Sequence, residues 1–187
     1  MSKKLGVEMA AVIVGNKKEF DKALTQEYES IFIRSVDNHY WEINYKQEDF
    51  DTKLIIESGK IILRGETEAE ARKDCQIIAL DKTEVSANDN SRVIAKNNSR
   101  IISYSTSTVI AYGSSYVLAK HNSKVIAHEL STVSANDGSK IIARVSSTVC
   151  ARDKCHVTAF DAAFIERMSH DAKIEINDFS FETDYDF

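Results

Sequence analysis

An eight-residue repeat constrains the fold of this chain more than any other feature of its sequence. Residues 59–170 consist of fourteen consecutive octads of the form Ser-x-Val-x-Ala-x-x-x, with no insertion between them. The third position is Ile or Val except at Ala69, and the fifth position is Ala throughout residues 71–159 except at Ser103. Small and apolar residues at positions one, three and five predict a strand with one buried face.

Positions six to eight of each octad carry residue types that form tight corners. Examples are Asn88-Asp89-Asn90, Lys96-Asn97-Asn98 and Asn136-Asp137-Gly138. Asn, Asp and Gly adopt left-handed or self-bonded backbone conformations readily, so they can replace Pro, which this chain lacks. Each octad is therefore predicted to form a five-residue strand followed by a three-residue corner.

The fourth position indicates how many octads close one coil. Alternate octads carry there Ile62, Ile78, Ile94, Ile110, Ile126, Ile142 and Thr158. The intervening octads carry Glu70, Ser86, Ile102, Leu118, Ser134, Cys150 and Glu166. A period of 16 residues separates the two sets, whereas a period of 24 mixes Ile with Ser. We therefore predict an all-β fold, a two-sided parallel β-solenoid with 16 residues per coil and about seven coils.

The segments beside the repeat are predicted to cap the solenoid, because an open end exposes unpaired backbone. Residues 1–58 are expected to form an α/β N-terminal cap, and residues 171–187 a strand and a short acidic tail. The predicted elements of the cap are strands at residues 7–14, 31–33, 41–45 and 54–56 and an amphipathic helix at 17–30. Asn16 and Glu19 are suited to begin that helix, and a further strand is expected at residues 173–177.

Charge is distributed unevenly along the chain, whose net charge is -5. Residues 59–170 carry 15 basic and 12 acidic side chains, whereas both flanking segments are acidic. No apolar run is long enough to predict a membrane-spanning helix, and three scattered cysteines indicate a reducing compartment rather than a disulfide framework. The cytoplasm is the predicted location.

The outward isoleucines form the candidate partner-binding surface. They are flanked at positions two and six by basic side chains, and the candidate residues are Ile78, Ile94, Ile110, Ile126, Ile142, Arg92, Lys96, Lys124, Lys140 and Arg144. An apolar row edged by cations suits an acidic, aromatic ligand, and exposed apolar patches of this extent usually mark an interface. Three covers remain possible, namely residues 1–58 of the same chain, a second copy in a homodimer, and a foreign protein.

The acidic tail is the second candidate surface, because aromatic and acidic residues alternate in it. Its aromatic residues are Phe179, Phe181, Tyr185 and Phe187. The tail could lie along the isoleucine row of its own or a neighbouring chain, reach a basic partner, or be disordered.

Catalytic, metal and cofactor sites are not predicted. The chain has no phosphate-binding glycine loop, nucleophile elbow or His-Glu-x-x-His motif. His121 and His128 fall on different faces, and Cys75 and Cys155 replace Ser at the inward first position, while Cys150 points outward. Acidic residues at position seven lack the glycine-rich nonapeptide of calcium-binding repeats. Nucleic acid is an unlikely partner: Tyr104, Tyr112 and Tyr116 could stack on bases, but the basic surplus is small.

The run Ala87-Asn88-Asp89-Asn90-Ser91-Arg92-Val93-Ile94-Ala95 resembles the octad-repeat β-solenoid segments of bacterial and prophage open reading frames. The resemblance covers residues 59–170 and implies the architecture but no catalytic residues. A looser similarity links the chain to pentapeptide-repeat proteins, some of which mimic DNA and inhibit DNA-acting enzymes. This chain differs in period and its rod is not acidic, so the acidic tail is the better candidate for mimicry.

These observations predict a non-enzymatic protein-binding scaffold, such as a phage or bacterial regulator or inhibitor that acts by stoichiometric binding. The alternative is a structural β-solenoid that assembles with itself as a homodimer or a larger species. Nucleic-acid binding or mimicry is the more distant alternative.

Overall fold

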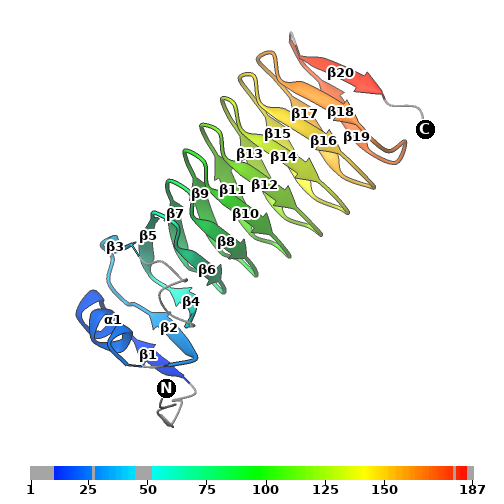
Figure 1. Cartoon of the computed structure of the whole chain (residues 1–187). Helices are drawn as coiled ribbons and strands as arrows, with labels where there is room; N and C mark the ends of the chain where they lie inside the picture. The colour runs from blue at the N-terminus through cyan, green and yellow to red at the C-terminus, as the bar shows by residue number, and fades with distance from the viewer. Residues whose placement is uncertain (1–10, 27, 45–51, 179, 185–187) are drawn as a thin grey trace, which may run out of the picture.

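The computed structural model describes residues 11–26, 28–44, 52–178 and 180–184 and shows a rod-shaped β-solenoid (Figure 1). Its long sheet has eleven parallel strands and its short sheet nine. The long sheet contains β1 (Val12–Val14), β2 (Ser30–Arg34), β4 (Lys53–Ser58), β6 (Glu68–Ala71), β8 (Glu84–Ala87), β10 (Arg100–Ser103), β12 (Tyr116–Ala119), β14 (Thr132–Ala135), β16 (Thr148–Ala151), β18 (Phe164–Arg167) and β20 (Phe181–Asp184). The short sheet contains β3 (Trp41–Asn44), β5 (Lys60–Arg64), β7 (Gln76–Ala79), β9 (Arg92–Ala95), β11 (Thr108–Ala111), β13 (Lys124–Ala127), β15 (Lys140–Ala143), β17 (His156–Ala159) and β19 (Lys173–Ile176).

The register confirms the prediction of two octads per coil. Ile110 on β11 lies between Ile94 on β9 and Ile126 on β13, each 16 residues away in sequence. The rod nevertheless has about ten turns instead of seven, because segments on both sides of the repeat add strands to the two sheets. These added turns are longer, since Ile31 pairs with Leu54 and Val157 pairs with Ile174.

The core between the sheets is narrow and is filled by the inward positions of the octad. Val or Ile at position three and Ala at position five are buried along the rod, as Val117 and Ala119 illustrate. Position one is also buried, and the hydroxyls of Ser107 and Ser131 donate to the carbonyl oxygens of Tyr104 and His128, three residues earlier. Because this bond satisfies the buried hydroxyl within its own corner, a small hydroxyl residue suits position one.

The corners share one backbone conformation at position seven. The φ angle there is positive from Gly65 through to Asp161, between +46° at Val145 and +67° at Gly65. Acidic side chains at several of these positions accept a hydrogen bond from the backbone N–H of the preceding corner on the same edge, as Asp89 does from Lys73 at 3.0 Å. The strands span positions two to five, one residue shorter than predicted, because position one already belongs to the corner.

Helix α1 (Lys17–Leu24) covers the N-terminal end of the core and ends earlier than predicted. The side chain of Asn16 caps it by accepting a hydrogen bond from the Glu19 N–H at 3.0 Å. Phe20 is buried, with its ring centroid 5.9 Å from that of Trp41. The predicted helix over residues 17–30 is too long, because Ser30 already begins β2 and pairs with Lys53 of β4.

The C-terminal residues continue the rod instead of forming a separate tail. β19 pairs with β17 in the short sheet, and β20 pairs with β18 at the end of the long sheet. Residues 181–184 therefore do not lie along the isoleucines of their own chain, as one expectation held. Arg167 and Glu182 occupy inward positions there and form an ion pair at 2.6 Å, so the described core ends in charged groups.

No helix in the described part of the chain has the length and apolar character needed to cross a membrane.

Candidate functional site

The outward face of the short sheet carries a ladder of aligned isoleucines. This Ile ladder consists of Ile62, Ile78, Ile94, Ile110, Ile126 and Ile142. Neighbouring coils lie about 4.8 Å apart, so each side chain shields the next and most are half-buried, while Ile142 is 37% exposed. Tertiary structure thus brings the five predicted isoleucines into one continuous row.

The described N-terminal elements do not cover this ladder. They extend the rod beyond β5 at its N-terminal end, as Figure 1 shows for α1, β1 and β2. Of these residues, Tyr40 approaches the ladder, where it helps to line a hollow beside Ile94. The expectation that the N-terminal region hides the isoleucines is therefore not met among the described residues.

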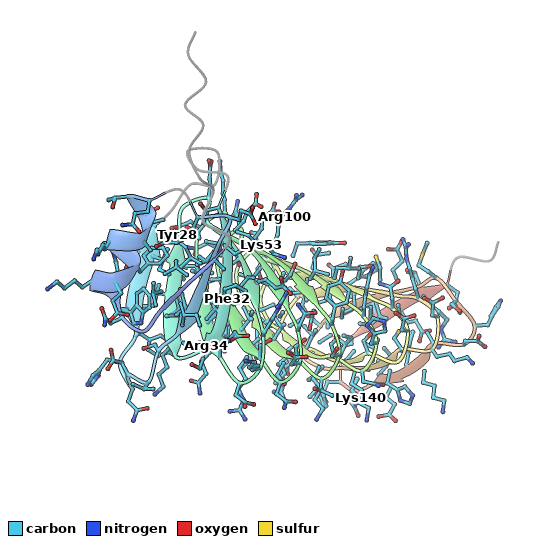
Figure 2. The ribbon with its side chains drawn as sticks, turned by 90° about the horizontal axis from the view of Figure 1, so that it is seen from below. Tyr28, Phe32, Arg34, Lys53, Arg100 and Lys140 are labelled. Carbon is cyan, nitrogen blue, oxygen red and sulfur yellow. The ribbon has the colours of Figure 1, made fainter. Side chains whose placement is uncertain are left out.

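Two columns of side chains border the Ile ladder. The position-two column contains Lys60, Gln76, Arg92, Thr108, Lys124, Lys140 and His156. The position-six column contains Arg64, Leu80, Lys96, Tyr112, His128, Arg144 and Phe160. We call the ladder with both columns, over strands β5 to β17, the isoleucine face. The five predicted cations all lie on it and are exposed, and Figure 2 shows Lys140 on the opposite side of the rod from Arg100.

Aromatic rings support the position-six column from within. The Lys96 ammonium lies 5.9 Å from the ring centroid of Tyr112, and that ring stacks on His128 with a centroid separation of 4.9 Å. The Arg144 guanidinium lies 5.1 Å from the Phe160 ring. These contacts hold the cations in place without neutralising them.

The cations of the isoleucine face have few counter-charges. Arg64 at the N-terminal end pairs with Glu42 at 2.8 Å. Among the described residues, no carboxylate forms an ion pair with Arg92, Lys124 or Lys140. The outward positions of strands β7 to β17, all described, contain no Asp or Glu. The acidic residues nearby lie at corners instead, where Glu129 accepts a hydrogen bond from the Gly113 N–H at 2.7 Å.

Two shallow hollows flank the ladder at β9. One, of about 320 Å³, lies beside Arg92 and Thr108, where the short threonine leaves space between longer side chains. The other, of about 490 Å³, lies beside Lys96 and Tyr112. On this strand Arg92, Ile94 and Lys96 point outward together, so an apolar side chain stands between two cations that are roughly 13 Å apart.

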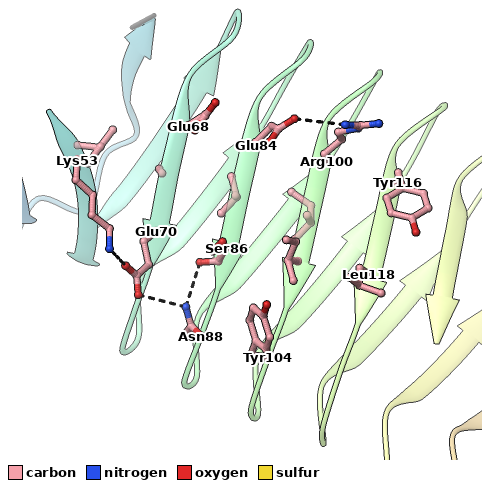
Figure 3. Close-up of a pocket in the computed structure, with 15 residues that line it drawn as sticks. Lys53, Glu68, Glu70, Glu84, Ser86, Asn88, Arg100, Tyr104, Tyr116 and Leu118 are labelled. Carbon is pink, nitrogen blue, oxygen red and sulfur yellow. Dashed lines mark hydrogen bonds and ion pairs between the residues drawn. The ribbon is translucent and has the colours of Figure 1, made fainter. Parts of the chain in front are cut away.

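The opposite face of the rod differs in charge and shape. A groove of about 850 Å³ crosses the long sheet from Lys53 to Leu118 (Figure 3). Glu70 lies in it and bonds to Arg72 at 2.7 Å and Lys53 at 2.9 Å, and the hydrogen bond from Arg72 is the main cause that lowers the pKa of Glu70. Sequence reasoning missed this groove, although the small Ser86 between two larger outward residues was the available signal.

A buried carboxylate joins three successive coils at the N-terminal end. Glu57 on β4 is 7% exposed and bonds to Arg34 on β2 and, at 3.0 Å, to Lys73 in the corner after β6. Burial raises the pKa of Glu57, but the hydrogen bonds from Lys73 and Arg34 outweigh burial and hold it below its ordinary value.

The remaining candidates do not assemble into one site. Phe181 is 64% exposed on β20, in the long sheet, and is therefore remote in topology from the Ile ladder. Phe179, Tyr185 and Phe187 lie outside the described residues. Tyr112 belongs to the isoleucine face, whereas Tyr104 and Tyr116 line the groove of the long sheet, so the three tyrosines form no common stacking platform.

The cysteines are protonated thiols near neutral pH. Burial raises the pKa of Cys75 to about 12 and of Cys155 to about 11. Burial, together with a hydrogen bond to Glu166, raises the pKa of Cys150 to about 11. In the described ranges, no group of three or more His, Cys, Asp or Glu side chains is arranged to hold a metal ion.

Comparisons of the chain with protein-family models, with curated proteins and with solved structures find no match. The functional argument therefore rests on the surfaces described above.

Proposed function

We propose that this protein is a non-enzymatic scaffold that binds another protein through its isoleucine face. The observation that carries the proposal is the uncovered Ile ladder, bordered on both sides by cations without counter-charges. Apolar rows with a polar border are typical of the centre and rim of protein interfaces. A partner that buries the isoleucines and supplies carboxylates to both columns would satisfy both features.

Charge argues for a foreign partner over a second copy of this chain. In a two-fold dimer the same patch lies on both sides of the interface. Because the outward positions of β7 to β17 contain cations and no carboxylates, every face-to-face arrangement of this stretch brings like charges together. Like-charge juxtaposition in an interface is costly.

Self-assembly is the second candidate function, because the Ile ladder alone could drive association by hydrophobic burial. Such a dimer would require the long side chains of Arg92, Lys124 and Lys140 to turn outward to water, which their flexibility permits. Dimer formation should then strengthen at high salt, where repulsion between the cations is screened.

The resemblance of the repeat to octad solenoids of bacterial and prophage origin extends the proposal. It favours a cytoplasmic regulator or inhibitor that acts by stoichiometric binding. A rigid rod suits this role, since a preformed surface loses little conformational entropy on binding.

The test combines solution mass with partner retention for the native chain and two matched variants. Ile94→Asp/Ile126→Asp places charges in the Ile ladder, whereas Ser86→Asp/Ser134→Asp places the same charges at equivalent positions of the long sheet. Light scattering is expected to show a monomer for all three proteins. A purified partner is expected to bind the native chain and the serine variant stoichiometrically, and the isoleucine variant at least tenfold more weakly. A native dimer that the isoleucine variant converts into folded monomers would refute the proposal in favour of self-assembly.

A further inference from the structure

We infer that the partner segment on the isoleucine face is an amphipathic α-helix that lies along the rod axis. Its apolar stripe would contact the Ile ladder, and acidic residues would border the stripe on both sides. This inference rests on the proposed function and adds the chemistry and shape of the bound segment.

Backbone hydrogen bonding favours a helix over a strand at this face. Peptides that bind by strand addition need the free edge of a sheet. Strands β5 to β17 of the short sheet are paired on both sides, so their backbone groups are already used. A segment bound over these strands must satisfy its own backbone groups, and a helix does this internally.

The dimensions of the face also fit a helix. The two columns are four residues apart along each strand, which corresponds to roughly 13 Å. A helix with its side chains is about 10–12 Å across, so it fits between the columns over the isoleucines. One helical turn advances about 5.4 Å, close to the spacing of about 4.8 Å between coils. From Ile78 to Ile142 the ladder covers roughly 19 Å, which is the length of about 13 helical residues.

The charges define which helix would be recognised. Arg92, Lys124 and Lys140 stand on one side of the ladder, and Lys96 and Arg144 stand on the other. A matching helix carries Asp or Glu on both flanks of its apolar stripe. Nucleic acid fits less well, because its charged backbone would have to cross the apolar ladder to reach both columns.

The aromatic contacts make the position-six column the more ordered of the two. Lys96 and Arg144 rest on Tyr112 and Phe160, whereas Lys124 and Lys140 have no ring or acidic partner among the described residues. A preorganised cation loses less conformational entropy when it binds. Neutralising Lys96 and Arg144 should therefore weaken binding more than neutralising Lys124 and Lys140.

The test uses a designed peptide of about 20 residues, long enough to span the ladder as a helix. The peptide carries Leu in a helical stripe and Glu on both flanks. One control shuffles the same residues so that the stripe is lost, and another replaces each flanking Glu by Lys. Binding is followed by fluorescence anisotropy with the full chain, and the helix content of the peptide by circular dichroism.

The striped acidic peptide is expected to bind, to gain helicity and to weaken as salt rises. Lys96→Gln/Arg144→Gln should weaken it about tenfold, and Lys124→Gln/Lys140→Gln less. The matched control Arg100→Gln/Lys120→Gln removes two cations from the long sheet and should leave the affinity unchanged. Equal binding of the shuffled peptide, or binding without gained helicity, would overturn the inference.

The outcomes also separate this inference from the proposed function. If no peptide binds while a purified partner is still lost on Ile94→Asp/Ile126→Asp, the helix inference fails and the proposed function stands. If a single-stranded oligonucleotide displaces the peptide and loses affinity in the same glutamine variants, the face recognises polyanions and the inference fails. If the native chain is a dimer through the ladder, both fail.

Discussion

Replacing Glu57 by Gln is expected to loosen the first coils of the rod, because this carboxylate joins three of them. The substitution preserves shape but removes the charge that binds Arg34 and Lys73. A hydrogen bond to a charged group contributes about 1.5–3 kcal/mol. Both basic partners are about half exposed, so solvent screening reduces these contributions. We expect the free energy of unfolding to fall by about 2 kcal/mol in total.

The same carboxylate should make stability depend on acidity. Because the folded-state pKa of Glu57 is lowered, its contribution is complete above the ordinary carboxyl pKa of about 4.3 and is lost as pH falls through the lower folded-state value. The native chain should therefore lose stability in that acidic range. The Gln variant should lose less there, so the two proteins should become more similar as the pH falls.

Urea unfolding and amide hydrogen exchange at neutral and acidic pH would measure this effect. Exchange matters because repeat rods open locally, and the loss should be concentrated in β2, β4 and β6. Glu84→Gln is the matched control, since Glu84 is exposed and pairs with Arg100 at 3.6 Å. The reasoning is refuted if both variants lose the same stability at neutral pH, or if the difference between native and Gln proteins persists in acid.

Four further outcomes are expected. Val117→Asp buries an unpaired charge at a fully enclosed position and should cost more than about 4 kcal/mol in urea unfolding. Asn97→Val puts a β-branched residue at a φ of +60° and should cost about 1–2 kcal/mol in the same assay. Cys150, with its pKa raised to about 11, should be alkylated slowly in native protein at pH about 8 and rapidly in urea, as mass spectrometry would show. Arg167→Ala/Glu182→Val removes the inward charges at the C-terminal end and should cause concentration-dependent association in light scattering, whereas unchanged monomers would contradict a protective role for these charges.

The repeat was readable because each octad meets the same physical requirements. Val at position three and Ala at position five alternate with polar residues, so the buried face and the strand direction follow from periodicity alone. The period of the outward isoleucines also revealed the number of octads per coil. These local rules hold along the whole rod because each coil contacts mainly its neighbours.

The ends were less readable because local preference and tertiary pairing disagree there. Residues 25–30 continue an amphipathic pattern, yet the chain leaves α1 early so that Ser30 can pair with Lys53. The C-terminal segment has no octad pattern, yet β19 and β20 extend both sheets by pairing with strands already formed. Unpaired strand edges recruit such segments, and this benefit is invisible in their own sequences.

The corners show the same division at single residues. Asn97 and Asp89 favour a left-handed backbone, so their corners could be predicted, but Val145 and His121 adopt it against their preference. Their neighbours in the stack impose the conformation, because every other coil turns at that position.

By itself the sequence determined the repeating strand, the identity of the buried side chains and the two-sided coil, since these depend on contacts within one or two octads. Only the tertiary structure decided how far the rod extends, which charges find partners and which surface remains uncovered. Those properties depend on side chains at least 16 residues apart, brought together when the coils stack.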